Sequence, residues 1–508
     1  MRKSALLLGC GAVLALAVPV HGRSPKKDDD REIRQPFAPR PKLRAAPSMG
    51  ATPGGAQDID FARSRILAGE VPHEKTFTPE GLLSQHDLPL PSTRKCREIL
   101  CLSGAATSAS LLAQPEVRYL AQLGFASNLD PKTWRRKPLN LVAVVDKSGS
   151  MSGDPLETVK ESLRHIATQM TPRDRLAIVL YGDRSHVHLA PTPLSRRAAV
   201  LSSIAQIQSA GSTAMEEGLR VGFDLALRSK AGFAGLTRVM LFTDERPNVG
   251  RTDKASFMGM AREASHKGVG MTTIGVSTHF GAEMATAVSS VRGGNLFFFP
   301  DASKMSARFA RDFDPMVTEL AHDMKLVVTP RKGFELVGLY GVPGEMVERT
   351  KNGGLSMKIE TIFLSRDKGG IFFGFAPKAG ALPAPAGAIA DAKLQYVDTQ
   401  KKRVQDSVGF PLTARRLAPL GLARGALLID QITTLKQASV LHGQKNQTEA
   451  AYRLVRDLHK RFRDTRISGL DKERALIRKL DETLTRLSGH KGEGGRVIAR
   501  DAVSGLPH

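Results

Sequence analysis

Cysteine and aromatic residues are scarce in this sequence. Its 508 residues include 3 cysteines and 1 tryptophan, and aromatic residues make up 5% of the chain. So few cysteines exclude a scaffold held together by many disulfides and do not supply the ligands of a zinc site. Hydrophobic residues nevertheless make up 41% of the chain, enough to bury the cores of about two to four domains. The composition predicts a globular, multidomain protein.

Long apolar runs are also missing, except at the N-terminus. Residues 1–22 combine a basic start with an apolar run over residues 5–20, which falls short of the ~20 residues that a membrane-spanning helix needs. This pattern predicts a secretory signal peptide and export to the periplasm or out of the cell. Two alternatives are an uncleaved anchor and a lipoprotein, because residues 7–10 resemble a lipobox that would be lipidated at Cys10. We expect no transmembrane span in the mature chain.

Acidic residues are too few to balance the basic ones. The chain has 74 Lys and Arg against 50 Asp and Glu, a formal net charge of +24. Such a charge favours anionic neighbours. In an exported protein these would be acidic proteins or anionic envelope polymers, so we expect no nucleic-acid partner.

The cysteines that remain after signal cleavage are close together. Cys96 and Cys101 are five residues apart, which allows a local disulfide in an oxidising compartment. The spacing does not match a redox Cys-x-x-Cys motif. We interpret the pair as a structural bridge.

Motifs for hydrolysis, zinc proteolysis and nucleotide binding are absent. The sequence has no Gly-x-Ser-x-Gly elbow, no His-Glu-x-x-His pair and no phosphate-binding loop. These absences favour a protein that is not an enzyme.

Composition shifts divide the chain into segments. Residues 23–57 are rich in Pro, Gly and charge and predict a disordered linker. Short runs between turn residues predict a β-sandwich at 322–415, and helical periodicity follows it. The expected organisation is a signal peptide (1–22), a linker (23–57), a small N-terminal region packing on its neighbour (58–138), an α/β domain (139–315), a β-sandwich (322–415), a C-terminal α-helical hairpin (418–490) and a tail (491–508).

Apolar strands alternate with amphipathic helices between residues 139 and 315. Strand patterns at 139–145, 175–181, 237–243 and 270–277 are separated by helix patterns such as 156–170 and 214–227. Uniformly apolar strands of this kind form a mostly parallel, doubly wound sheet with helices on both faces. Ligands bind at the carboxyl ends of the strands in such sheets. Asp146, Ser148 and Ser150 follow the first strand, and Asp244 follows a later one.

Carboxylates and hydroxyls at these strand ends form a set of oxygen donors. Hard divalent cations such as Mg²⁺, Mn²⁺ or Ca²⁺ prefer oxygen ligands. A metal with few directly bound carboxylates stays electrophilic and can accept a carboxylate from a partner.

These motifs resemble a von Willebrand factor type A (VWA) domain with a metal-ion-dependent adhesion site. Asp146, Ser148 and Ser150 correspond to its Asp-x-Ser-x-Ser element, and "AGSTAMEEGL" and "LFTDERPNVG" correspond to its other two loops. The resemblance implies that the hydroxyls of Ser148, Ser150 and Thr213 ligate the metal, while Asp146 and Asp244 bind it directly or through water. Glu245 departs from the family, which usually has glycine there. The succession of domains resembles exported bacterial VWA proteins and, more loosely, the inter-α-trypsin-inhibitor heavy chains.

Three hypotheses about function follow. The first is an adhesion or assembly protein that captures an Asp or Glu side chain of a partner protein through its bound cation. The second is a metal-activated envelope hydrolase or enzyme subunit, for which Glu245 is the nearby candidate acid or base. The third is a structural envelope protein with a metal that supports the fold. The resemblance favours the first.

Overall fold

The computed structural model describes residues 49–490 except 54–58, 91–95, 213, 245–253, 277–290, 292, 300–301, 343–346 and 379–386. The expected signal peptide with Cys10, most of the linker and the tail lie outside these residues. Within the part of the chain that is described, no helix has the length and apolar character needed to cross a membrane.

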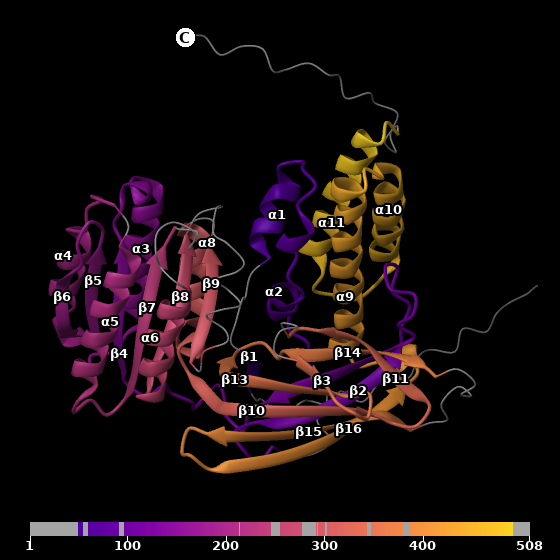
Figure 1. Ribbon diagram of the computed structural model, residues 1–508, viewed down its shortest axis with the longest axis horizontal. Coiled ribbons are helices and arrows are strands. Elements are labelled where there is room, and N and C mark those ends of the chain that lie inside the picture. Colours follow the sequence, from indigo (N-terminus) through magenta and orange to yellow (C-terminus); the bar gives the residue numbers. More distant parts are fainter. Residues whose placement is uncertain are drawn as a thin grey trace, which may run out of the picture. The chain divides into compact units, whose positions relative to one another are not determined.

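A six-stranded sheet with helices on both faces forms the α/β domain (Figure 1). In chain order its elements are β4 (Leu139–Asp146), α3 (Asp154–Gln169), β5 (Arg175–Tyr181), β6 (His186–Pro193), α4 (Arg197–Ala205), α5 (Met215–Lys230), β7 (Leu236–Thr243), α6 (Lys254–His266), β8 (Val269–Val276), β9 (Gly294–Phe299) and α8 (Ala302–Met316). The strand order is β6-β5-β4-β7-β8-β9, and all neighbours are parallel except β5 and β6. This confirms the predicted doubly wound, mostly parallel sheet.

Burial on both faces explains why these strands are uniformly apolar. Every residue of β4 and of β8 is buried. One apolar cluster lies between the sheet and α3, α4 and α8, and a second lies between the sheet and α5 and α6. A strand covered on both faces needs apolar residues at consecutive positions, without alternating polar ones. The sequence shows this uniformly apolar pattern.

Two glycines bring α5 close to the sheet. A Cβ added at Gly222 would lie 2.4 Å from Cγ2 of Val144, and one at Gly218 would lie 2.7 Å from the ring of Tyr181. Any larger residue at either position would push the helix away from β4 and β5. The glycines therefore fix the position of the loop that leads into α5.

A second sheet contains ten strands, which come from the segments before and after the α/β domain (Figure 1). Its strands are β1 (Gly50–Pro53), β2 (Cys101–Ser108), β3 (Tyr119–Ala126), β10 (Glu319–Pro330), β11 (Phe334–Tyr340), β12 (Val347–Arg349), β13 (Leu355–Ser365), β14 (Gly370–Pro377), β15 (Ala388–Asp398) and β16 (Arg403–Thr413). Their order is β1-β13-β10-β15-β16-β2-β3-β14-β11, with β12 beside β13. The sheet is antiparallel except where β16 runs parallel to β2.

This arrangement differs from the small N-terminal region that we expected at 58–138. β2 and β3 lie inside the ten-stranded sheet, and β1 joins it from within the expected linker. The reason is visible in β3, where Ala121 and Leu123 face the core of the sheet and Leu120 faces a cluster of helices. A strand with two apolar faces needs cover from both sides, which residues 58–138 do not supply alone.

Helices from both ends of the chain pack together on this sheet. They are α1 (Asp60–Leu67), α2 (Pro79–Ser84), α9 (Leu420–Ser439), α10 (Thr448–Asp464) and α11 (Asp471–Leu487). One apolar cluster contains residues of all five helices and of β2 and β3. The expected C-terminal helices are present, and α9, buried around most of its circumference, lies at their centre.

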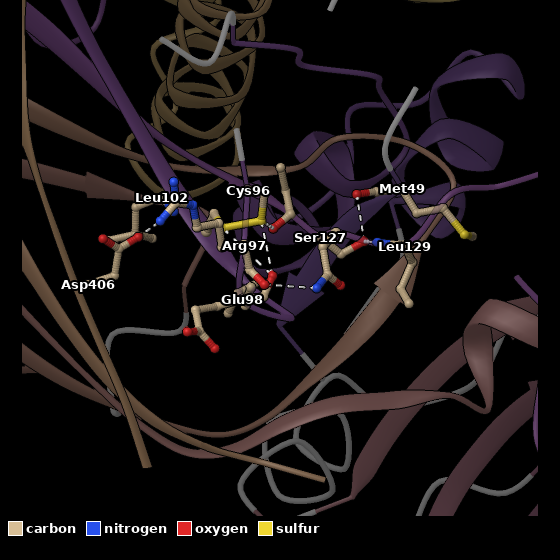
Figure 2. The surroundings of a disulfide bond; sticks show 12 residues. Met49, Cys96, Arg97, Glu98, Leu102, Ser127, Leu129 and Asp406 are labelled. Carbon is tan, nitrogen blue, oxygen red and sulfur yellow. Dashed lines mark hydrogen bonds between the residues drawn. A yellow bond between two sulfur atoms is a disulfide. The ribbon is translucent and has the colours of Figure 1, made fainter. Parts of the chain in front are cut away.

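A disulfide links Cys96 and Cys101 where the chain enters β2 (Figure 2). Next to it, Leu102 donates its backbone N–H to Asp406 over 3.0 Å, and Asn128 donates to the carbonyl of Arg97 over 3.1 Å. Ser127 donates its backbone N–H to the carbonyl of Met49 over 2.9 Å. The bridge therefore lies where β1, β2, β3 and β16 are held together.

Candidate metal centre

Asp146 is the last residue of β4 and is completely buried. Its Oδ1 accepts the backbone N–H of Ser148 over 2.9 Å. Its Oδ2 accepts the hydroxyls of Tyr181 over 3.0 Å and of Thr243 over 3.1 Å, at the ends of the two neighbouring strands. Hydrogen bonds are required when a carboxylate is buried, and these three fix the side chain at the carboxyl edge of the sheet.

A chain of oxygen atoms extends from the same loop toward solvent. The hydroxyls of Ser148 and Ser150 lie 3.0 Å apart, and Ser150 donates to Oδ1 of Asp244 over 3.1 Å. Ser148 is buried, whereas Ser150 is exposed. The structure therefore brings together four of the five residues expected to hold a metal, and the set opens to solvent at Ser150.

Thr213 and Glu245 lie outside the described residues, but the loop around Thr213 is fixed on both sides. Gly149 donates its backbone N–H to the carbonyl of Gly211 over 3.0 Å, and Ala214 donates to the carbonyl of Gly182 over 3.1 Å. These bonds hold the chain on either side of position 213 against the loop after β4 and the end of β5.

Asp183 supports the same loop. Its Oδ1 accepts the backbone N–H of Ser212 over 2.7 Å. Hydrogen bonds from the hydroxyl and the backbone of Ser212 hold the pKa of Asp183 below its usual value. Gly211, with φ +89°, has no room for a side chain, since an added Cβ would lie 2.6 Å from Oδ2 of Asp183. The carboxylate thus shapes the turn immediately before Thr213.

The donor set fits a hard divalent cation. Two carboxylates and two hydroxyls offer only oxygen ligands, which suits Mg²⁺, Mn²⁺ and Ca²⁺ and does not suit softer metals. Among the described residues, no group of three or more His, Cys, Asp or Glu side chains could hold a metal. A site here would therefore depend on the serine hydroxyls in addition to Asp146 and Asp244.

Sequence reasoning missed Tyr181 and Thr243, the two hydroxyl groups that hold Asp146. Both are the last residue of an apolar strand, at the same sheet edge as Asp146. The sequence does show that each of these three apolar strands ends in a residue with a side-chain oxygen. It does not show that the three residues are neighbours, because β5 and β7 flank β4 only in the folded sheet.

The residues that form this sheet and its helices match a known protein family. Residues 140–310 match the von Willebrand factor type A domain. VWA domains mediate protein interactions and commonly bind a divalent metal. We refer to residues 140–310 as the VWA domain.

The relatives cover mainly this part of the chain. An uncharacterized protein of Synechocystis, sll0103, is 29% identical over 182 residues, which is 36% of this chain and 42% of that protein. The uncharacterized protein YfbK of Escherichia coli is 28% identical over 200 residues, 39% of this chain and 34% of that protein. Inter-alpha-trypsin inhibitor heavy chain H1 of Mesocricetus auratus is 29% identical over 28% of this chain and 16% of its own length. The chain thus spans less than half the length of these relatives.

Among solved structures, a von Willebrand factor type A protein from Catenulispora acidiphila is similar to this chain. It has a TM-score of 0.47 and 13% identity, and the match covers 77% of this chain and 98% of that one.

Proposed function

We propose that this is an exported protein that binds an acidic group of a partner protein through a divalent cation held by the VWA domain. The observation that carries the proposal is the group of oxygen ligands at one sheet edge. The side-chain oxygens of Ser148, Ser150 and Asp244 are hydrogen-bonded in series, and Asp146 beside them accepts the backbone N–H of Ser148. The inner end of this group is buried and its outer end is exposed. A cation held there, with Thr213 as a further ligand, would present an open coordination position to a partner carboxylate.

The proposed role is binding rather than catalysis. The hydrogen bonds that fix Asp146 occupy both of its oxygens, so it is suited to support a metal and not to move protons. The excess of basic residues would attract an acidic partner and speed its approach. We propose the periplasm or the outside of the cell as the place of action.

Calorimetric titration of Mn²⁺ and Mg²⁺ tests the metal site. Ser150→Ala removes one donor and leaves the buried hydrogen bonds of Asp146 in place, so the variant should fold. We expect saturable binding to the unmodified protein and at least a ~10-fold loss of affinity in the variant. Ser152→Ala, an exposed hydroxyl in the same loop, is the control and should bind like the unmodified protein.

Capture from a cell-envelope extract tests the adhesion step. A partner retained in Mg²⁺, released by a chelator and lost with Ser150→Ala supports the proposal. Metal binding without any chelator-sensitive partner would contradict the adhesion role, and absence of metal binding would contradict the site itself.

A further inference from the structure

The amino edge of the six-stranded sheet, opposite the candidate metal centre, carries a dense group of cations. Three loops meet there: residues 135–139 before β4, residues 170–175 at the start of β5, and residues 194–197 between β6 and α4. Because β6 runs antiparallel to β5, its last residue lies at this edge, with Pro193 opposite Arg175. The three loops contain seven Lys and Arg residues and one carboxylate, Asp174. The edge therefore has a strong excess of positive charge.

Asp174 holds the three loops together and is completely buried. Its carboxylate accepts two hydrogen bonds from Arg136, over 3.1 and 2.8 Å, and the backbone N–H of Leu139 over 2.6 Å. Its backbone carbonyl accepts the N–H of Leu194 over 2.9 Å. These contacts fix the loops close to one another.

The negative charge of Asp174 is balanced within this buried contact. Burial alone would raise the pKa of Asp174, but the hydrogen bonds and the charge of Arg136 lower it. Arg136 also donates to Asp314 of α8 over 2.7 Å. Both carboxylates are therefore engaged by a buried guanidinium and do not neutralise the cations on the surface.

Lys137, Arg173 and Arg196 are the exposed cations of these loops. Each lies within two residues of a contact made by Asp174, and all three side chains are exposed. In the described part of the chain none of them has a carboxylate partner. They belong to three neighbouring strands, β4, β5 and β6, which are about 4.8 Å apart in a sheet. We call these three residues the cationic row.

The start of α4 adds a further positive charge to the same edge. The first turn of a helix favours acidic side chains, because its unpaired backbone N–H groups carry a partial positive charge. α4 has no acidic residue in its first turn, and it begins with Arg197 after Arg196 at the N-cap position. This placement is unfavourable by itself, and an anion bound at the edge would relieve it.

We propose that the cationic row docks the protein on an anionic membrane surface, where it contacts the phosphate groups of acidic phospholipids. Exposed cations in a row suit an extended charged surface, whereas a small ion would need side chains that enclose it. Strands β4 and β5 run from this edge to the metal centre, so the docked protein would hold the metal centre away from the membrane. This inference goes beyond the function proposed above and does not depend on it.

Flotation of the full chain with phospholipid vesicles tests the charge requirement. Phosphatidylcholine vesicles with and without phosphatidylglycerol differ in charge, so the difference reports electrostatic docking and not insertion of the apolar run at the N-terminus. We expect phosphatidylglycerol to strengthen binding on the order of 100-fold, and the gain to be lost as salt is raised. Equal binding to both kinds of vesicle would overturn the proposal.

Substitutions in the cationic row locate the docking surface. Lys137→Gln, Arg173→Gln and Arg196→Gln should each weaken binding to phosphatidylglycerol vesicles about fivefold. The three side chains are exposed, so the combined variant should fold, and an unchanged urea transition checks this. Full binding by the folded triple variant would place the docking surface elsewhere.

A second triple variant controls for net charge. Lys325, Lys358 and Lys393 are exposed on β10, β13 and β15, so replacing them by Gln removes the same charge from the ten-stranded sheet. We expect this variant to bind the vesicles nearly as well as the unmodified protein. Equal losses in the two triple variants would show attraction to the general basic surface instead.

A soluble polyanion is the alternative partner. Inorganic polyphosphate offers the same phosphate chemistry without a membrane. We expect the full chain to bind phosphatidylglycerol vesicles more tightly than polyphosphate at equal phosphate concentration. Equal or tighter binding of polyphosphate would indicate a polymer as the partner and overturn membrane docking.

Energy transfer from Trp134 to a dansyl-labelled lipid tests the orientation. Trp134 is the single tryptophan and precedes Lys137 by three residues. The 8 residues of β4 separate the two edges of the sheet by about 26 Å. We therefore expect strong transfer when the amino edge faces the membrane. Weak transfer in vesicle-bound protein would show that another surface is docked.

Discussion

Asp146 connects the fold of the sheet edge with the proposed metal site. Its three hydrogen-bond donors come from the loop after β4 and from the ends of β5 and β7. Removing the carboxylate would leave these donors unpaired in a buried place, so Asp146→Ala would change folding and metal binding together. A substitution of one donor separates the two effects better.

Tyr181→Phe removes a single hydroxyl and keeps the ring. We expect the free energy of unfolding to fall by about 1 kcal/mol, since one buried hydrogen bond is lost. We expect Mn²⁺ affinity to fall about 10-fold, because the hydrogen bond orients a residue of the metal site. Urea denaturation and calorimetry measure the two quantities. Tyr119→Phe, in the ten-stranded sheet, should leave the affinity unchanged, and an unchanged affinity in Tyr181→Phe would remove the positioning role of Tyr181.

Glu473 joins elements from the two ends of the chain. It lies on α11 and is completely buried, and its Oε1 contacts Arg63 of α1 at 2.5 Å and His86, after α2, at 3.2 Å. Its Oε2 accepts from Gln431 of α9 over 2.6 Å. Burial alone would raise the pKa of Glu473, but the hydrogen bond from His86, the charge of Arg63 and the hydrogen bond from Gln431 lower it to about 2.

This lowered pKa predicts acid sensitivity of the helical part. Because the carboxyl titrates near 4.5 when unfolded and near 2 when folded, its contribution is complete above about pH 4.5 and is lost as the pH falls toward 2. The contribution is on the order of 3 kcal/mol. Urea denaturation followed by circular dichroism between pH 5 and 2.5 measures it.

Glu473→Gln should lower stability at neutral pH and flatten the pH dependence in that window. Glu482→Gln, on the exposed side of the same helix, should behave like the unmodified protein. A Glu473→Gln variant with the full acid dependence would show that other carboxyls cause it.

Arg238 links the VWA domain to the ten-stranded sheet. It is 2% exposed and donates to the carbonyls of Met271 and Gly293 over 2.8 and 3.0 Å. Its other guanidinium nitrogen lies 2.5 Å from Glu319, the first residue of β10, and its guanidinium carbon lies 5.1 Å from the ring centre of Phe363. Burial lowers the pKa of Arg238, and the charge of Glu319 opposes this.

Glu319→Ala leaves this buried cation without its carboxylate. We expect the free energy of unfolding to fall by about 3–5 kcal/mol. The contacts between the two sheets should be the part that is destabilised. Trp134, the single tryptophan, packs against the core of the ten-stranded sheet, so its fluorescence reports that part. In urea, fluorescence and circular dichroism should give coincident transitions for the unmodified protein and separated ones for the variant.

The exposed Glu335 of β11 supplies the control, because Glu335→Ala should leave the transitions coincident. Coincident transitions in Glu319→Ala as well would mean that the two sheets unfold together without this ion pair.

The sequence pattern was sufficient to predict those features that depend on residues close together in the chain. The apolar strands, the helical periodicity and the positions of Asp146, Ser148, Ser150 and Asp244 at strand ends were all predicted, and the sheet brings those four residues together. Each strand shows its burial in its own composition, and parallel strands place their carboxyl ends at one edge. Metal binding at these residues and capture of an acidic partner stay predictions.

Long-range pairing decided the rest. No pattern in residues 101–126 indicates that β2 pairs with β16, whose paired residues are 306 positions away, or that Glu473 meets Arg63. The cationic row likewise requires three loops that are separated in the sequence. Secondary structure follows from periodicity along the chain, but the partners of a strand face or a buried charge are chosen by competition among all the surfaces that could cover them. Only the tertiary structure records the outcome of that competition.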